Sequence, residues 1–246
     1  MFDLTGRIAL VTGAGQGVGA ALSHALAGQG ATVAVNDIAP ERAEAVAQAI
    51  EANGGRALAV TADIRDERSV TAMVATIEAT AGPVDVLVNN AGVPSRGFEM
   101  VAFQATGPED WAPYLAVNVT GTMLCTRAVL GGMTTRGDGR IISIVSDAAR
   151  VGEPGTAAYS AAKGGIVGFT RSLAKEVGRS GVTCNCVSLG RIVVDGPTDG
   201  SGADRYALRR FGRPEDIAGA VVWLASDDAS WVTGQTIPVN GGYASS

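Results

Sequence analysis

The chain has 246 residues, of which 46% are apolar and 17% are charged, and its formal net charge at pH 7 is −5. This length suffices for one large domain with a sizeable core, and the composition excludes an intrinsically disordered chain. Because the chain is acidic and no apolar run approaches the roughly 20 residues of a membrane-spanning helix, we expect neither nucleic acid nor a membrane as a partner.

The N-terminus and the cysteines indicate the compartment. The opening MFDLTGRIALVTG lacks the basic start, apolar stretch and cleavage site of a signal peptide, so a cytoplasmic location is expected. Cys125, Cys184 and Cys186 are too few and too unevenly spaced for a disulfide framework or a zinc site. We expect three buried free thiols and no bound metal.

Short β-branched runs alternate with longer Ala-rich segments, and no repeat or Pro/Ser-rich linker divides the chain. Strands are predicted at Ile8–Val11, Thr32–Val35, Ala57–Val60, Val84–Val88, Arg140–Val145, Val182–Val187 and Thr236–Val239. Helices are predicted at Gly17–Gln29, Glu41–Asn53, Glu67–Ala81, Glu109–Met133, Ala157–Val177 and Glu215–Ala225. This alternation predicts one α/β domain over residues 1–246, a Rossmann-like, doubly wound parallel sheet with helices on both faces.

A glycine-rich loop, TGAGQGVG, separates the first predicted strand from the first predicted helix. Glycines let the backbone approach a pyrophosphate closely, and the N-terminus of the following helix offers N–H groups and a partial positive charge. Such turns also arise from packing alone, but this position in the chain favours a dinucleotide site. The loop residues expected at the cofactor are Gly13, Gln16, Gly17, Val18 and Gly19.

Two aspartates follow the second and third predicted strands. Asp37 can accept hydrogen bonds from both hydroxyls of the adenosine ribose and would repel a 2′-phosphate, while Gln16 and Ile38 are uncharged. We therefore predict NAD(H) rather than NADP(H); the alternative is that Asp37 only caps a helix or occupies a turn. Asp63 has two open interpretations, a contact with the adenine edge or a cap for the next helix.

Four polar residues are candidates for catalysis. Tyr159 and Lys163, in YSAAK, are spaced i and i+4 and therefore share one helix face. A cation one turn away favours the phenolate and would lower the tyrosine pKa from about 10, which makes the pair a plausible general acid/base. Ser146 ends the fifth predicted strand, where a ligand crevice opens, and Asn118 lies in an apolar helical stretch where a buried amide needs partners.

The chain resembles the short-chain dehydrogenase/reductase family over nearly its whole length. The resemblance is carried by TGAGQGVG, NNAG at Asn89–Gly92, Asn118, Ser146, YSAAK and the C-terminal RFGRPEDIAGAVVWLAS. It implies that Tyr159 is the acid/base and that Ser146 orients the substrate oxygen. It also implies that Lys163 binds the nicotinamide ribose and lowers the pKa of Tyr159, and that Asn118 holds a water in a proton relay.

The resemblance further implies the remaining cofactor contacts. Asn90, Ala91 and Gly92 would flank the cofactor, and Asp63 with Ile64 would contact the adenine. The family usually has Pro-Gly after the sixth strand and a Thr four residues beyond the Gly, where this chain has Leu189 and Val194. Nicotinamide anchoring is therefore expected to rest on backbone groups such as those of Ile192.

Two variable segments are expected to set substrate specificity. One is the extended stretch around Pro94–Gly107, and the other is a short mobile lid near residues 195–210, rich in turn formers from Asp195 to Asp204. Pro113 is expected to kink or delay the helix that carries Asn118.

Self-association is also expected. Between Thr156 and Arg171 the only charged residue is Lys163, and a helix that is apolar all round is buried on more than one side. Gly164, Gly165 and Gly168 suggest a close backbone approach. By resemblance the assembly is a homotetramer, with a dimer as the alternative.

Together these features predict an NAD(H)-dependent oxidoreductase that interconverts a secondary alcohol and a ketone. The alternative is a 3-oxoacyl-[acyl-carrier-protein] reductase or an acyl-CoA-type 3-hydroxyacyl dehydrogenase, suggested by SDAARVG at Ser146–Gly152, although such relatives usually prefer NADPH. A second alternative is a non-catalytic dinucleotide sensor, which Leu189 and Val194 favour and the four polar residues oppose. The chain has no G-x-S-x-G motif, and its one histidine, His24, falls in the first predicted helix, which argues against a hydrolase.

Overall fold

The computed structural model describes residues 2–93, 100–194 and 200–244. Its centre is a seven-stranded parallel sheet with the strand order β3-β2-β1-β4-β5-β6-β7. The strands are β1 (Ile8–Val11), β2 (Thr32–Asp37), β3 (Arg56–Thr61), β4 (Val86–Asn89), β5 (Gly139–Ser146), β6 (Val182–Leu189) and β7 (Thr236–Val239). The predicted doubly wound sheet is confirmed, and its order reverses between β1 and β4, where such sheets open a ligand crevice.

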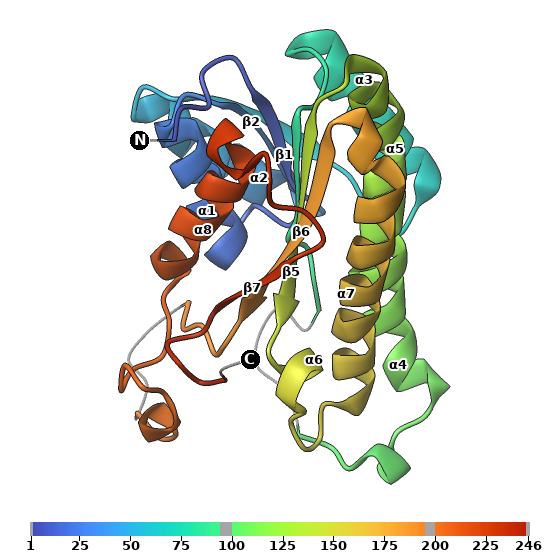
Figure 1. Cartoon of the computed structure of the whole chain (residues 1–246), viewed down its shortest axis with the longest axis vertical. Coiled ribbons are helices and arrows are strands. Elements are labelled where there is room, and N and C mark those ends of the chain that lie inside the picture. The colour runs from blue at the N-terminus through green and yellow to red at the C-terminus, as the bar shows by residue number, and fades with distance from the viewer. Residues whose placement is uncertain (1, 94–99, 195–199, 245–246) are drawn as a thin grey trace.

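Helices cover both faces of the sheet (Figure 1). One face carries α1 (Gly17–Gly28), α2 (Pro40–Ala52) and α8 (Pro214–Ala225), and the other carries α3 (Glu67–Thr80), α5 (Thr122–Arg136) and α7 (Ala157–Val177). α2 and α8 each begin with a proline in the first turn, where its missing N–H is not needed. These helices match the predicted ones closely, apart from the start of α5.

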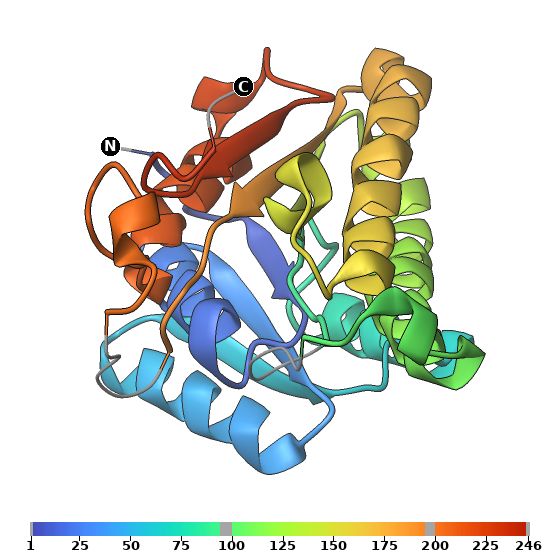
Figure 2. The ribbon, with the colours of Figure 1, turned by 90° about the horizontal axis from the view of Figure 1, so that it is seen from below.

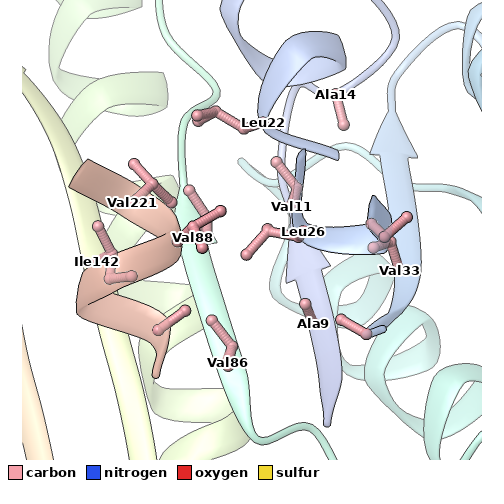
Figure 3. Packing of buried hydrophobic residues seen from close by; sticks show 14 of the residues in the cluster. Ala9, Val11, Ala14, Leu22, Leu26, Val33, Val86, Val88, Ile142 and Val221 are labelled. Carbon is pink, nitrogen blue, oxygen red and sulfur yellow. The ribbon is translucent and has the colours of Figure 1, made fainter. Parts of the chain in front are cut away.

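Successive residues of β1 point to opposite faces and help to build two cores. Ala9 and Val11 pack in the cluster beneath α1, α2 and α8, whereas Ile8 and Leu10 pack beneath α3, α5 and α7. Figure 3 shows Leu26 of α1 lying over Val11 in the first cluster. Because both faces of the sheet are covered, β1 and residues 86–88 of β4 are continuously apolar, as the sequence indicates.

The predicted helix Glu109–Met133 is divided into three segments. α4 (Pro108–Tyr114) leads into a π-helical segment, η2 (Leu115–Gly121), which leads into α5. Pro113 lies inside α4 without ending it, and the helix starts at Pro108, so no delay occurs. The helix is instead irregular at η2, where the turns are π-helical and therefore wider than in an α-helix. Asn118 lies in this segment.

The carboxyl ends of the strands meet several short elements (Figure 2). These are η1 (Phe103–Ala105), α6 (Ala148–Val151) and η4 (Ala203–Arg205), none of which the sequence pattern predicted. The described half of the predicted lid is anchored: the Leu208 N–H donates to the Gly241 carbonyl at 3.1 Å, and the Tyr206 hydroxyl accepts from the Arg191 N–H at 3.0 Å. Residues 94–99 and 195–199, which belong to the two predicted specificity segments, lie outside the described residues.

No helix in the described part of the chain is long and apolar enough to cross a membrane. The same residues contain no cluster of three or more potential His, Cys, Asp or Glu metal ligands. The three cysteines are free and buried, as predicted. Burial raises the pKa of Cys125 and of Cys184 to about 12, so both are thiols at neutral pH.

Candidate active site

The structure brings the four predicted catalytic residues together at the carboxyl end of β5. Tyr159 and Lys163 lie one turn apart on α7, with the Lys163 Nζ 6.0 Å from the centre of the Tyr159 ring. Ser146 is the last residue of β5 and is hydrogen bonded to Tyr159. Asn118 enters from η2 on the other side of Lys163, with Gly92 between them.

Ser146 is oriented by the backbone that follows it. Its Oγ accepts a hydrogen bond from the Ala148 N–H at 3.2 Å, at the start of α6. Because the Ser146 Oγ acts as an acceptor in this contact, its own hydroxyl proton is available for donation on the side of Tyr159. The turn after β5 therefore sets the direction in which Ser146 donates.

Tyr159 is largely enclosed by its neighbours. Burial raises the pKa of Tyr159 above 10, and the hydrogen bond to Ser146 only partly opposes this. The ring of Tyr114, from α4, meets the Tyr159 ring edge-on with centroids 6.1 Å apart. At neutral pH Tyr159 is therefore a protonated phenol.

Lys163 is almost completely buried. Its Nζ donates to the Ile144 carbonyl of β5 at 2.9 Å, and burial lowers the pKa of Lys163 to about 8. Lys163 is not among the groups that shift the pKa of Tyr159, because its hydrogen bond points to β5 rather than to the phenol. The lowering of that pKa by Lys163 stays a prediction.

Asn118 locks the loop after β4. Its Nδ2 donates to the Val93 carbonyl at 2.9 Å, and its Oδ1 accepts from the Val93 N–H at 3.2 Å. A Cβ on Gly92 would lie 2.7 Å from the Asn118 Oδ1 and 3.3 Å from the Lys163 Nζ, so only glycine fits there. The buried amide thus has the partners that its position required, in the backbone of Val93, directly after the NNAG motif.

The glycine loop leaves no room for a side chain at Gly13 or Gly19. A Cβ on Gly13 would lie 2.7 Å from the Ala91 Cα, and one on Gly19 would lie 2.3 Å from the Gly13 carbonyl oxygen. Asn90 closes the loop from β4, because its Nδ2 donates to the carbonyls of Thr12 and Gly13, each at 3.0 Å. The loop between β1 and α1 is thus a backbone cradle, and Ala91 lies against it as expected.

The loop leads into a helix start that can receive an anion. Gln16 is the N-cap of α1 but makes no side-chain cap, and the first turn contains no acidic residue. Gly17 adopts φ 56°, a conformation that favours glycine, and a Cβ there would lie 3.3 Å from the Val194 side chain. The uncapped N–H groups and the helix dipole suit a pyrophosphate, so these residues fit a dinucleotide.

Asp37 is buried at the end of β2 and is held by the backbone. Its Oδ2 accepts from the Gly15 N–H at 3.1 Å, and its Oδ1 accepts from the Ala39 N–H at 3.0 Å. Asp37 is the last residue of β2 and the N-cap of α2 is Ala39, so Asp37 does not cap the helix. Through Gly15 it faces the glycine loop, as a ribose-binding residue should.

Asp63 faces a basic partner. Its carboxylate accepts two hydrogen bonds from the Arg65 Nε and one from the Nη2, at 2.6 to 3.0 Å, which lowers the pKa of Asp63. It is not the cap of α3, because that role belongs to Asp66, which accepts from the Arg68 N–H. The adenine contact of Asp63 stays a prediction.

The predicted cofactor residues Val18, Ile38 and Ile64 differ in exposure. Ile38 is largely exposed after β2, and Val18 is half-buried in the first turn of α1. The Ile64 side chain is buried against Gly121 of η2.

The segment after β6 offers backbone groups. A parallel bridge pairs Ile192 with Gly212, using the Val193 N–H and the Arg191 carbonyl. The N–H and carbonyl of Ile192 therefore point away from this bridge. This geometry fits the expected anchoring through Ile192, while Leu189 is simply buried at the end of β6 beside Ser146.

Several residues that shape the site were missed from the sequence. Asp147 is buried directly after Ser146 and accepts from the Ser188 Oγ at 2.6 Å and from the Asn240 Nδ2 at 2.5 Å. Tyr114 and Arg42 reach Tyr159 and Asp37, respectively. The adjacency of Asp147 to Ser146 was a usable signal, whereas nothing in the local pattern marks Tyr114.

Comparison with known proteins agrees with this geometry. A sequence model of a family described as "Enoyl-(Acyl carrier protein) reductase" matches residues 13–244. The chain is 42% identical to a 3-oxoacyl-[acyl-carrier-protein] reductase of Synechocystis sp. over 98% of both chains. It is 40% identical to a (2S)-[(R)-hydroxy(phenyl)methyl]succinyl-CoA dehydrogenase subunit of Thauera aromatica over 96% of both.

A solved structure gives the same result. The gluconate 5-dehydrogenase from Burkholderia cenocepacia J2315, in complex with NADP and tartrate, matches with a TM-score of 0.91 at 32% identity, covering 98% of this chain and 96% of the other. The fold and the site define an α/β oxidoreductase with a nicotinamide dinucleotide as cofactor. The chain belongs to the short-chain dehydrogenase/reductase family.

Proposed function

We propose that this protein interconverts a 3-oxoacyl thioester and a 3-hydroxyacyl thioester, with NAD(H) as the hydride carrier. The observation that carries the ketone/alcohol chemistry is the hydrogen-bonded Ser146–Tyr159 pair at the end of β5. The thioester class comes from the relatives, whose names specify an acyl-carrier-protein substrate and a CoA substrate. The broader reaction, a secondary alcohol to a ketone, needs the same residues.

The roles of the side chains follow from their protonation. A bound nicotinamide supplies or accepts the hydride. Because the pKa of Tyr159 is raised, its phenol carries the proton that a ketone oxygen must receive during reduction. Ser146 donates a hydrogen bond to the same oxygen, and we expect the pair to favour the reductive direction at neutral pH.

Lys163 and Asn118 act next to this pair. With a pKa of about 8, Lys163 is mostly cationic at pH 7 and can donate to a ribose hydroxyl. Asn118 holds the loop after β4 in place, and its part in a proton relay remains a proposal.

The choice of NAD(H) rests on Asp37. Its carboxylate is fixed by two backbone N–H groups at the strand end where the adenosine ribose binds in sheets of this kind. A fixed carboxylate can accept from both ribose hydroxyls and repels a 2′-phosphate.

Replacing Tyr159 tests the proposed chemistry. Tyr159→Phe should reduce turnover of acetoacetyl-CoA with NADH by about 100-fold or more, because the proton donor is lost, while calorimetric binding of NADH stays nearly unchanged. Tyr243→Phe is a matched control, since it removes a phenol from the C-terminal segment. A Tyr159→Phe enzyme that kept most of its rate would show that the acid/base assignment is wrong.

A substrate panel tests the thioester class. Acetoacetyl-CoA, a 5-keto sugar acid and a simple cyclic ketone would be compared by the absorbance of NADH. The proposal predicts the highest kcat/KM for the thioester. Selective reduction of the sugar acid would overturn the thioester class and leave the ketone reductase chemistry intact.

A further inference from the structure

A buried carboxylate follows the serine of the candidate site. Asp147 comes directly after Ser146 at the end of β5, and its side chain is only 2% exposed. A carboxylate at this depth is destabilising unless donors surround it, so its partners are a built feature of the fold. The proton donation by Tyr159 and the hydrogen bond from Ser146 to the ketone do not use this carboxylate directly.

Three donors hold the Asp147 carboxylate. Its Oδ1 accepts from the Ser188 Oγ of β6 at 2.6 Å and from the Arg150 Nη1 of α6 at 3.1 Å. Its Oδ2 accepts at 2.5 Å from the Nδ2 of Asn240, the residue that follows β7. Hydrogen bonds to an ionised acceptor are strong, so this one carboxylate ties together the carboxyl ends of β5, β6 and β7.

The amide of Asn240 has a fixed orientation. Its Nδ2 also donates to the Ala244 carbonyl at 2.8 Å, and its Oδ1 accepts from the Gly242 N–H at 3.0 Å. The C-terminal segment therefore presents an N–H donor to Asp147. A carboxylate has an acceptor oxygen on both sides, whereas an amide at this position would turn a donor toward either Asn240 or Arg150.

The backbone of Asp147 connects this anchor to Ser146. The Asp147 N–H donates to the Leu189 carbonyl at 2.9 Å, and its carbonyl accepts from the Arg150 N–H at 2.8 Å within α6, which lies next to the end of β5 (Figure 1). The N–H of Ala148, the residue in between, donates to the Ser146 Oγ at 3.2 Å. A shift of Asp147 would therefore move the N–H group that orients the serine hydroxyl.

We propose that Asp147 is a positioning residue for Ser146: it ties the turn after β5 to β6 and to the C-terminal segment, and thereby holds the Ser146 hydroxyl where it donates to the substrate oxygen. The inference rests on the proposed function, because it concerns the serine that binds the ketone oxygen. A donor that is fixed before the reaction stabilises the negative charge that develops on this oxygen in the transition state.

The test is a double-mutant cycle with Ser146, measured on the ketone of the substrate panel that the wild type reduces fastest. Asp147→Asn should lower kcat about tenfold or more, while KM and the calorimetric dissociation constant of NADH change less than about threefold. In the Ser146→Ala background the same change should lower kcat less than about twofold, because the donor that Asp147 positions is already gone.

A second variant, Asn240→Ala, tests the link from the other side and keeps the test valid if Asp147→Asn folds poorly. It removes one donor and leaves the carboxylate with Ser188 and Arg150. We expect kcat to fall about three- to tenfold, and this loss should also disappear in the Ser146→Ala background.

Asp138→Asn is a matched control for stability. Asp138 precedes β5 at the opposite end of the same strand, where it pairs with Arg7 and Arg140. Urea unfolding should show a loss of stability for Asp138→Asn as well as for Asp147→Asn, since each removes charged hydrogen bonds. We expect kcat of Asp138→Asn to stay within about twofold of the wild type.

The outcomes distinguish the inference from the proposed function. A loss in kcat of equal size with and without the Ser146 hydroxyl, a change in KM alone, or an unchanged kcat in Asp147→Asn would overturn the inference and leave the oxidoreductase proposal standing. A wild type that reduces no ketone of the panel would overturn both.

Discussion

Lys163 shows how burial changes a side chain that the sequence identifies by spacing alone. Its position four residues after Tyr159 correctly placed both groups on one helix face. The pattern could not show that the ammonium is enclosed between β5 and the loop after β4, with its Nζ bonded to the Ile144 carbonyl. The lowered pKa of Lys163 therefore affects the stability of the fold as well as catalysis.

The first prediction concerns that shift. The pKa of Lys163 falls from 10.5 in the unfolded chain to about 8 in the folded one, so between these values the unfolded state holds a proton that the native state has lost. Stability then rises with pH across this window, by about 2 kcal/mol between pH 8 and pH 10. Lys163→Met removes the contribution, whereas Lys175→Met, at an exposed site on the same helix, keeps it.

Urea unfolding at several pH values would measure the difference in unfolding free energy between wild type and variant. The thiols of Cys125 and Cys184, whose pKa values are raised, act in the opposite direction above pH 9, but they are present in every variant and cancel in the difference. Lys163 lowers the pKa of the Cys186 thiol, so the contribution of Cys186 does not cancel, and the comparison is made between pH 8 and pH 9. Parallel stability curves for the wild type and Lys163→Met would contradict the buried position of the ammonium.

Thr12 joins two strands at the point where the sheet order reverses. It is buried at the end of β1, and its Oγ1 accepts from the N–H groups of Asn90 and Ala91, each at 3.1 Å. The first residues after β4 are thereby tied to the start of the glycine loop. The sequence pattern predicted β1 and β4 as strands. The hydrogen bonds that connect their ends are made by Thr12, which the sequence pattern identified only as part of the glycine-loop motif.

Replacing Thr12 tests the importance of this connection. Thr12→Val keeps the shape but leaves two partly buried N–H groups without an acceptor, and we expect a loss of about 1–3 kcal/mol in unfolding free energy. Thr12→Ser retains the oxygen and should cost less than about 1 kcal/mol. Urea unfolding followed by far-UV circular dichroism measures both; equal losses for the two variants would show that the methyl group, and not the hydroxyl, is what matters.

At the scale of the whole molecule, α7 has one side on the sheet and one side exposed. Its exposed face in the single chain carries small residues, among them Ala161, Gly165, Gly168 and Ser172. No atom of the described chain lies within 4 Å of a Cβ placed on Gly165 or Gly168. The close approach suggested by these glycines is therefore absent within the described chain, and a second copy remains our prediction for it.

Light scattering at micromolar concentration tests that prediction. We expect four times the mass of one chain, or twice that mass for a dimer. Gly165→Glu should shift the population to smaller species, because it places a charge on the flat face. A wild type that scatters as a monomer would refute self-association through α7.

The sequence determined the parts of this protein that depend on local pattern. Apolar runs and their alternation with helical segments predicted the seven strands and the sheet type. The glycine loop, Asp37 and the YSAAK spacing located the site, because backbone access and the helical repeat act within a few residues.

Only the tertiary structure decided what these groups do to one another. Burial in the folded chain raises the pKa of Tyr159. The π-helical segment η2 brings Asn118 into hydrogen-bonding distance of Val93, and the start of α2 places Arg42 in an ion pair with Asp37. Burial and hydrogen bonding are made by segments that meet in space from distant parts of the chain. Protonation states therefore follow from packing, which no local pattern contains.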